Sequence, residues 1–211
     1  MTPIEIAKNK ETFIQLCKKY IQREGLDKVL AYLEHSDFFT APSSTGFHLN
    51  EEGGLCLHSI HVFENACRIY DHIALPYIKE GVSPFDCEIS RESIAIVALF
   101  HDICKVKLYH KVEKWKKDSN NKWMSYPGYE VKDEFPFGHG EKSCLMLSWY
   151  MRLKPEEMLA IRWHMGMFDV SENGSSQRYA FYAALDKHPL VSIIHSADFL
   201  SSKLAEKTTT Y

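Results

Sequence analysis

Residues 94–100 are all apolar and run directly into a histidine and an aspartate, His101 and Asp102. Helical spacing over 91–105, with Ser90 in the position of an N-cap, predicts a helix that is apolar on nearly every side and therefore central in the fold. A buried imidazole beside a buried carboxylate is costly unless the two are paired or bind a metal. The pair therefore either caps the helix end through a mutual hydrogen bond or belongs to a metal site.

Four further histidines and aspartates lie in otherwise apolar segments, so on helices they would point inward with their neighbours. Inward imidazoles and carboxylates from several helices are how bundles build metal sites. A carboxylate can bridge two ions, so the set accommodates one divalent ion or two, and these ligand types do not distinguish Fe, Mn, Ni, Co, Zn and Mg. The four residues are His58, His139, His164 and Asp198.

In chain order these residues resemble the H…HD…H…H…D pattern of the HD-domain metal-dependent phosphohydrolase superfamily, over about residues 54–203. The resemblance implies an α-helical bundle. It also implies a first ion held by His58, His101, Asp102 and Asp198, and a second held by Asp102, His139 and His164. Asp102 would then be the bridging ligand and a catalytic residue.

Three more residues are candidates for contact with the substrate. Lys105, in the motif HDICK where Cys104 replaces the usual glycine, matches a lysine that related proteins place near the substrate, and we expect it to be catalytic. The alternative is a solvated lysine at a helix end. Arg162 would neutralise charge in the transition state, and Tyr129 would form a lip over the pocket.

The other histidines carry weaker expectations. His61 and His195 each lie one helical turn from a proposed ligand, so they would either orient that ligand or pack in the core. The remaining five are expected at the surface: His35, His48, His72, His110 and His188.

The chain of 211 residues is long enough for one well-buried domain, which we expect to span 1–211. Apolar periodicity predicts an all-α bundle, while alternation over 111–117 and 122–126 around Asp118 predicts a small β-hairpin inserted at about 109–134. A loop is expected at 171–176. The helices are expected within 13–20, 26–33, 54–73, 91–105, 140–152, 155–164 and 189–207.

The predicted hairpin interleaves five lysines with two tryptophans, Trp115 and Trp123. Such a combination could hold phosphates and stack bases. We interpret it instead as a solvated hairpin whose aromatic rings pack on the body, because Glu113 and Asp118 dilute its charge. Nucleic-acid binding is therefore not indicated. The lysines are Lys111, Lys114, Lys116, Lys117 and Lys122.

The overall composition limits the expected binding partners and the expected cellular location. A net charge of −3 provides no global attraction to nucleic acid or anionic lipid. No apolar run is long enough to cross a membrane and no secretory signal is recognisable, so a cytoplasmic protein is expected. The six cysteines form no C-x-x-C pair and are expected to be reduced and packed: Cys17, Cys56, Cys67, Cys87, Cys104 and Cys144.

The sequence therefore predicts a metal-dependent phosphohydrolase that cleaves a phosphoester, of a nucleotide or a related small molecule. Two alternatives stay open. The same ligand order resembles the mixed-valent di-iron oxygenases of the HD fold, and a non-enzymatic binding module with a structural metal would need the same residues. No oligomeric state follows from the sequence.

Overall fold

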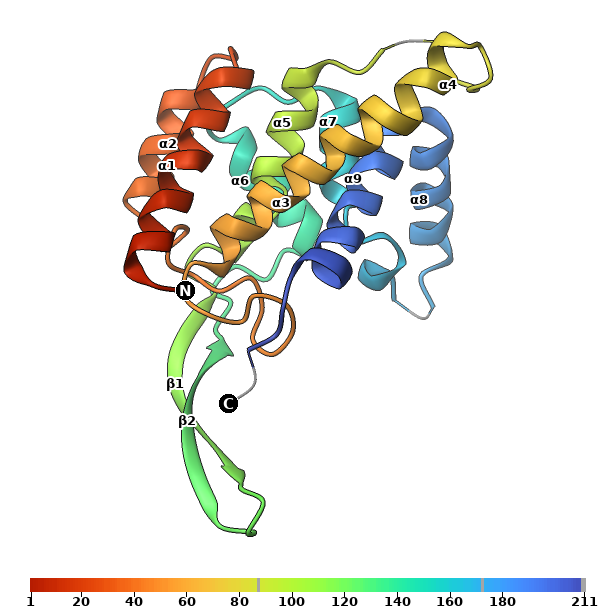
Figure 1. The fold of residues 1–211 in the computed structure, drawn as a ribbon. Coiled ribbons are helices and arrows are strands. Elements are labelled where there is room, and N and C mark those ends of the chain that lie inside the picture. The colour runs from red at the N-terminus through yellow and green to blue at the C-terminus, as the bar shows by residue number, and fades with distance from the viewer. Residues whose placement is uncertain (87, 172, 210–211) are drawn as a thin grey trace.

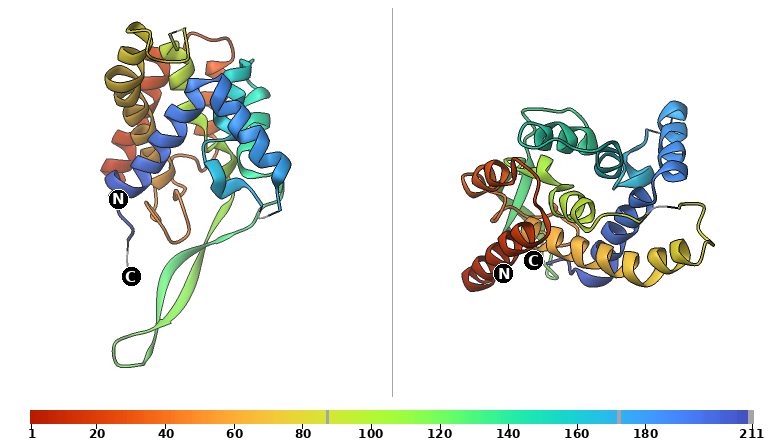
Figure 2. Two further views of the ribbon diagram at one scale, coloured as in Figure 1. Left: turned by 90° about the vertical axis from the view of Figure 1, so that its right-hand side faces the viewer. Right: turned by 90° about the horizontal axis from the view of Figure 1, so that it is seen from above.

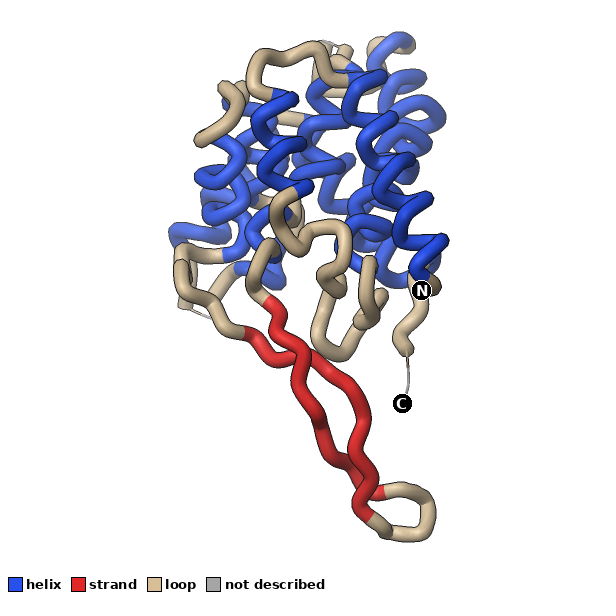
Figure 3. Tube along the Cα trace, turned by 90° about the vertical axis from the view of Figure 1, so that its left-hand side faces the viewer, coloured by secondary structure: helices blue, strands red, loops and turns tan. Residues whose placement is uncertain are grey.

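A bundle of helices forms the body of the protein, and a single β-hairpin projects from one end of it (Figures 1 and 3). The structure is a computed structural model and describes residues 1–86, 88–171 and 173–209. The predicted all-α fold with a small hairpin is confirmed. The longer helices are α1 (Pro3–Tyr20), α2 (Leu26–Glu34), α3 (Gly54–Ile69), α5 (Arg91–Phe100), α6 (His139–Ser148), α7 (Pro155–Arg162), α8 (Ser175–Lys187) and α9 (Pro189–Leu200).

Helix α5 lies at the centre of the bundle and contacts α1, α3, α7 and α9. Its N-terminus is capped as expected, because the Ser90 side chain accepts a hydrogen bond from the backbone N–H of Ser93 at 3.1 Å. Every residue from 93 to 100 is buried. The helix ends at Phe100, so His101 and Asp102 leave it inside the core, ahead of a short 3₁₀ turn at Ile103–Lys105.

A buried acidic side chain ties the first helices to this core. Glu157 of α7 is fully buried. Its carboxylate accepts hydrogen bonds from the Arg23 guanidinium at 2.9 Å and from the Ser93 hydroxyl at 2.7 Å. The backbone N–H of Lys154 donates to it as well, at 2.8 Å. The charge is thus compensated, as a buried carboxylate requires.

Three helical segments differ from the expectation. The helix predicted over 54–73 ends at Ile69, and the chain continues through a π-helical turn at Tyr70–Ala74 into the short α4 (Leu75–Lys79). Helix α9 likewise continues into a π-helical turn, Ser201–Ala205. Helix α8 was not predicted, and the loop expected at 171–176 overlaps its start. Its large aromatic residues are mostly outward, with Tyr179 78% exposed, so the sequence lacks a clear apolar face.

The hairpin consists of β1 (Tyr109–Lys117) and β2 (Trp123–Val131), which pair antiparallel. Its position is as predicted, but the expected packing of its aromatic rings on the body is wrong. Trp115 and Trp123 are 59% and 65% exposed. The views in Figure 2 show why, since the strands extend away from the helices and reach beyond any neighbouring element.

The five cysteines within the described ranges are free thiols, as predicted, and four of them are buried. Cys87 lies outside the described residues. No described helix combines the length and the apolar character needed to cross a membrane.

Candidate metal centre

The six predicted metal ligands meet in the interior of the bundle, although five separate elements supply them. His58 belongs to α3, Asp198 to α9, and His139 begins α6, where Gly138 adopts a φ of 84° at the N-cap. His101 and Asp102 follow α5, and His164 follows α7. Five of the six are at most 8% exposed, and the His139 side chain is 25% exposed.

Asp102 occupies the middle of this cluster. One carboxylate oxygen lies 2.8 Å from Nε2 of His139 and 3.5 Å from Nε2 of His164. The other oxygen lies 3.4 Å from Nε2 of His101. Nε2 of His58 approaches the Asp198 carboxylate at 3.1 Å and Nε2 of His101 at 3.3 Å.

Hydrogen bonds on the far side of three imidazole rings orient these rings, and in His101 and His164 they place the proton on Nδ1. Nδ1 of His101 faces the Ala98 carbonyl oxygen at 2.8 Å, and Nδ1 of His164 faces that of Ile161 at 2.6 Å. Nδ1 of His58 faces the Glu206 carboxylate at 3.0 Å. A ring nitrogen that faces an acceptor must donate, so Nε2 of His101 and Nε2 of His164 each present a lone pair when the ring is neutral. Both nitrogens of His58 face carboxylates: burial would lower its pKa, but Glu206 and Asp198 raise it to about 10. The Nε2 atoms of all three rings point towards one centre, which the carboxylates of Asp102 and Asp198 also face.

This donor set fits divalent metal ions. Nε2 of His164 is buried and makes no hydrogen bond among the described residues, which is costly for a polar atom unless something else satisfies it. Neutral imidazoles whose second nitrogen is held by a carbonyl or carboxylate are typical metal ligands. Ligand atoms within 4.8 Å of one another occur in the sets His58–His101–Asp198, His101–Asp102–His164 and Asp102–Cys104–His139. Buried His/Asp clusters able to hold a metal are therefore present.

Lys105 lies inside the site, so it is not the solvated lysine of the alternative interpretation. Its side chain is 10% exposed, and its Nζ donates to the Asp102 carboxylate at 2.6 Å. Burial alone would lower the pKa of Lys105, but the adjacent Asp102 raises it above its usual value. Burial would raise the pKa of Asp102, yet Lys105 and His101 hold it well below its usual range. Lys105 is therefore positively charged and Asp102 negatively charged, and the two form a buried ion pair.

Glu206 is a functional candidate that the sequence analysis missed. Its side chain is fully buried, and it accepts from Nδ1 of His58 and Nδ1 of His61, both at 3.0 Å. The expectation that His61 would pack or act indirectly fits this arrangement. Glu206 orients the His58 ring through the nitrogen that faces away from the cluster. No sequence signal marks it, because it follows the last helical turn in a polar segment.

His48 was expected at the surface, and this is wrong. Its side chain is 20% exposed, its ring centroid lies 5.0 Å from that of His58, and its Nε2 is 3.8 Å from Glu206. Burial lowers the pKa of His48 to about 4. It is therefore a neutral ring in the wall of the site. His195 donates from Nδ1 to the carbonyl oxygen of His164 at 2.7 Å, so it supports the loop that carries that ligand.

A cavity of about 380 Å³ opens above the cluster. Its wall combines the proposed ligands with Lys105, Tyr109 and His195 and with aromatic residues at its rim. The rim residues are Phe47, Phe168 and Phe199, which are 72%, 78% and 46% exposed. The cavity therefore joins the buried His/Asp cluster to solvent.

Two predicted substrate residues do not line this cavity. Arg162 pairs with Glu141 at 2.6 Å and with Asp169 at 2.7 Å, and its guanidinium stacks 4.0 Å from the ring centroid of Trp163. Tyr129 is 8% exposed and sits in β2 opposite Lys111. Arg162 pairs with residues outside the cluster and Tyr129 is buried in the hairpin, so the structure does not bring either side chain to the cluster.

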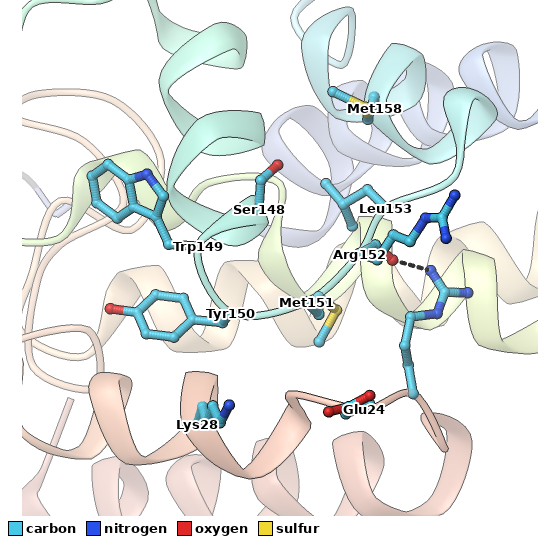
Figure 4. A pocket seen from close by; sticks show the side chains of 10 residues that line it. Glu24, Lys28, Ser148, Trp149, Tyr150, Met151, Arg152, Leu153 and Met158 are labelled. Atoms are coloured by element: carbon cyan, nitrogen blue, oxygen red, sulfur yellow. Dashed lines mark hydrogen bonds between the residues drawn. The ribbon is translucent and has the colours of Figure 1, made fainter.

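A second hollow, of about 460 Å³, lies elsewhere on the body, between the α1–α2 connection and the α6–α7 connection (Figure 4). Here the Arg23 guanidinium donates to the backbone carbonyl oxygen of Arg152 at 3.1 Å. Trp149 and Tyr150 extend along one side. The described residues that line this hollow include none of the proposed metal ligands, so we do not associate it with the centre.

The protein is thus a helical bundle with an interior His/Asp cluster that could hold metal, below an open cavity. A model of the protein family described as HD domain matches residues 57–202. The chain belongs to the HD domain family, as the resemblance in the sequence implied. Comparisons with curated proteins and with solved structures give no significant match.

Proposed function

We propose that this chain is a metal-dependent phosphohydrolase that cleaves a phosphoester of a nucleotide or a related small molecule. The observation that carries the proposal is the convergence of three imidazole Nε2 atoms with the carboxylates of Asp102 and Asp198, at the base of an open cavity. Phosphohydrolases are the commonest activity of HD domains, which supports this choice over other metal chemistry.

We assign the two ions as the resemblance implies, with Asp102 as the shared ligand. His58, His101 and Asp198 complete the first set, and His139 and His164 complete the second. Divalent ions bound there would polarise a phosphoryl oxygen and lower the pKa of a bound water. Because His101 and His164 are held by backbone carbonyls, the chain keeps their lone pairs oriented in advance.

Lys105 supplies the positive charge closest to the cluster, and we propose that it contacts the substrate phosphate. Its ammonium group is buried against Asp102, so little solvent screens it. It would therefore stabilise negative charge that develops on the phosphoryl oxygens. The exposed rings of Phe47 and Phe168 at the rim offer flat apolar surface on which a nucleobase could stack.

The test is hydrolysis of a panel of nucleoside mono-, di- and triphosphates and simple phosphoesters by anaerobically purified protein, with each candidate divalent ion added separately. We expect phosphate release with at least one ion and its loss in Asp102→Asn. Turnover that needs iron and consumes oxygen would instead identify an oxygenase. Unchanged hydrolysis in Asp102→Asn would contradict the assignment of the site.

A further inference from the structure

The β1–β2 hairpin carries lysines and aromatic rings that neither the bundle nor the metal centre uses. Residues 109–131 contain five lysines against three carboxylates, a net charge of +2, whereas the rest of the chain has 20 basic and 25 acidic residues, a net charge of −5. Nine residues per strand, at about 3.3 Å each, extend the hairpin about 30 Å (Figure 3). The hairpin is a positive arm on a negative body.

The lysines of this arm are available to an anion. Lys111 pairs with Glu52 at 3.0 Å, but the other four have no carboxylate within 4.0 Å among the described residues. Two of them lie over rings of the hairpin itself, with Nζ of Lys117 5.5 Å from the Trp123 centroid and Nζ of Lys116 5.6 Å from that of Tyr126. Positive charge and aromatic surface therefore occur side by side.

The two tryptophans lie on one face of the hairpin. Trp115 pairs with Ser125, and Trp123 pairs with Lys117, so the two rings are diagonal neighbours on the same side of the ladder. They are 59% and 65% exposed. Large aromatic rings usually bury their faces, and on a two-stranded hairpin these rings add nothing to the core. Lys117 lies over one face of Trp123, and the exposed surface that remains on both rings can stack against another flat group.

The hairpin also begins at the metal cavity. Tyr109, the first residue of β1, lines that cavity together with Ser44. The next residues of the same loop, Thr45 and Gly46, line a further hollow of about 300 Å³ together with Lys114 and Lys116. No carboxylate lines this hollow in the part of the chain that the structure describes. Lys114 and Lys116 therefore offer their charge to a phosphate group in this hollow.

We infer that the hairpin binds single-stranded nucleic acid, with phosphates held by Lys114, Lys116, Lys117 and Lys122 and unpaired bases stacked on Trp115 and Trp123. Lys117 shares the face of the two tryptophans, whereas Lys114 and Lys116 lie on the opposite face of the ladder, so a bound strand would cross the hairpin from one face to the other. Cations together with exposed aromatic rings suit a strand whose bases are free, because stacking needs an exposed base face. The positive charge recognises the backbone and not the sequence. This binding is independent of the metal centre, so it persists when the proposed hydrolase activity is absent.

The experiment measures fluorescence anisotropy of labelled single-stranded DNA and RNA oligonucleotides with the full chain, in EDTA so that no hydrolysis occurs. With four lysines engaged, the slope of log affinity against log salt is about −2.8, and a fourfold rise in salt weakens binding about 50-fold. Trp115→Ala/Trp123→Ala should weaken binding at least about tenfold. Trp115→Phe/Trp123→Phe should restore most of it, since the aromatic faces return.

A second pair of variants tests the contribution of the lysine charges of the hairpin. Lys114→Glu/Lys116→Glu should weaken binding and flatten the salt slope. The matched control is Lys8→Glu/Lys28→Glu, which changes the net charge equally at exposed positions on α1 and α2, outside the hairpin. We expect it to bind within about twofold of the wild type.

Three results would overturn the inference. One is no binding of either oligonucleotide tighter than about 100 μM at low salt, the weak end of non-specific affinity. Another is equal weakening by the hairpin and control lysine pairs. The third is a wild-type dimer in light scattering that Trp115→Ala/Trp123→Ala converts to monomer while oligonucleotide affinity is unchanged, which would make the hairpin a protein contact. Circular dichroism of each variant verifies that the helices are intact.

Discussion

The role of Glu206 gives a sharp prediction, because this residue lies outside the proposed ligand set and is nevertheless joined to it. Its carboxylate accepts from Nδ1 of His58 and of His61 at 3.0 Å, from a fully buried position. The Glu206→Gln variant keeps the shape of the side chain but removes its charge. The amide is a weaker acceptor, so the His58 ring is held less firmly and its Nε2 is less basic.

Loss of such an outer partner weakens metal affinity about 10- to 100-fold, or about 1.4 to 2.7 kcal/mol. Competition against a chromogenic chelator, with each divalent ion in turn, measures the change. The matched control is Glu64→Gln, on the same helix as His58 but on the surface, where Glu64 pairs only with Arg68 at 3.7 Å. Equal metal affinities in the wild type, Glu206→Gln and Glu64→Gln would refute the reasoning.

Three further predictions concern other parts of the chain. A Cβ at Gly140 would lie 2.2 Å from the backbone oxygen of Arg162, so Gly140→Ala should lower the free energy of unfolding by about 1 to 3 kcal/mol in urea melts, and an unchanged midpoint would contradict this contact. Burial would raise the pKa of Glu92, but the backbone N–H of Gln22 and a neighbouring arginine lower it below its usual 4.5. The ionised form therefore contributes stability above that value and loses it as the pH falls through the folded pKa, so Glu92→Gln should separate from the wild type in urea melts near about pH 7 and converge with it near about pH 3, whereas a constant separation would argue against the linkage. Lys105→Met should lower kcat for phosphoester hydrolysis about 100- to 1000-fold while the number of bound ions stays the same, and full activity would remove Lys105 from the mechanism.

The meeting of the candidate ligands in the interior could be predicted because most of them lie in segments whose local pattern is strong. His58 and Asp198 interrupt apolar helical faces, and His101 and Asp102 end a helix that is buried all round. A polar residue in such a place needs a partner, so the sequence already carries the physical constraint. The helix pattern and the order of the ligands then agree on one arrangement.

The partners of these residues could not be predicted, because they depend on tertiary contacts between polar segments. His48 lies in a stretch without periodicity and Glu206 at the polar end of the helix predicted to residue 207, so only the fold brings both against His58. For Arg162 the sequence pattern was clear, but the prediction made from it does not match its contacts. It follows the helical pattern and stands near His164 in the chain, yet Glu141 and Asp169 take up its charge. Proximity in sequence did not predict where its guanidinium points.

The hairpin illustrates a limit of a general rule. Aromatic residues on an amphipathic segment usually pack on the body, and on that basis the rings of Trp115 and Trp123 were expected to be covered. The alternation of the strands was correctly read, but no local pattern reports whether a hairpin lies along the body or extends from it. Exposure of both rings is therefore a structural finding.

The most direct test of the account is the number of metal ions bound per chain, measured by elemental mass spectrometry on anaerobically purified protein beside His139→Ala and Asp102→Ala. The account predicts two ions in the wild type, a fall towards one in His139→Ala, and a fall towards none in Asp102→Ala, because Asp102 is the shared ligand. No bound metal in the wild type after reconstitution, or an unchanged content in Asp102→Ala, would contradict a metal centre at this cluster.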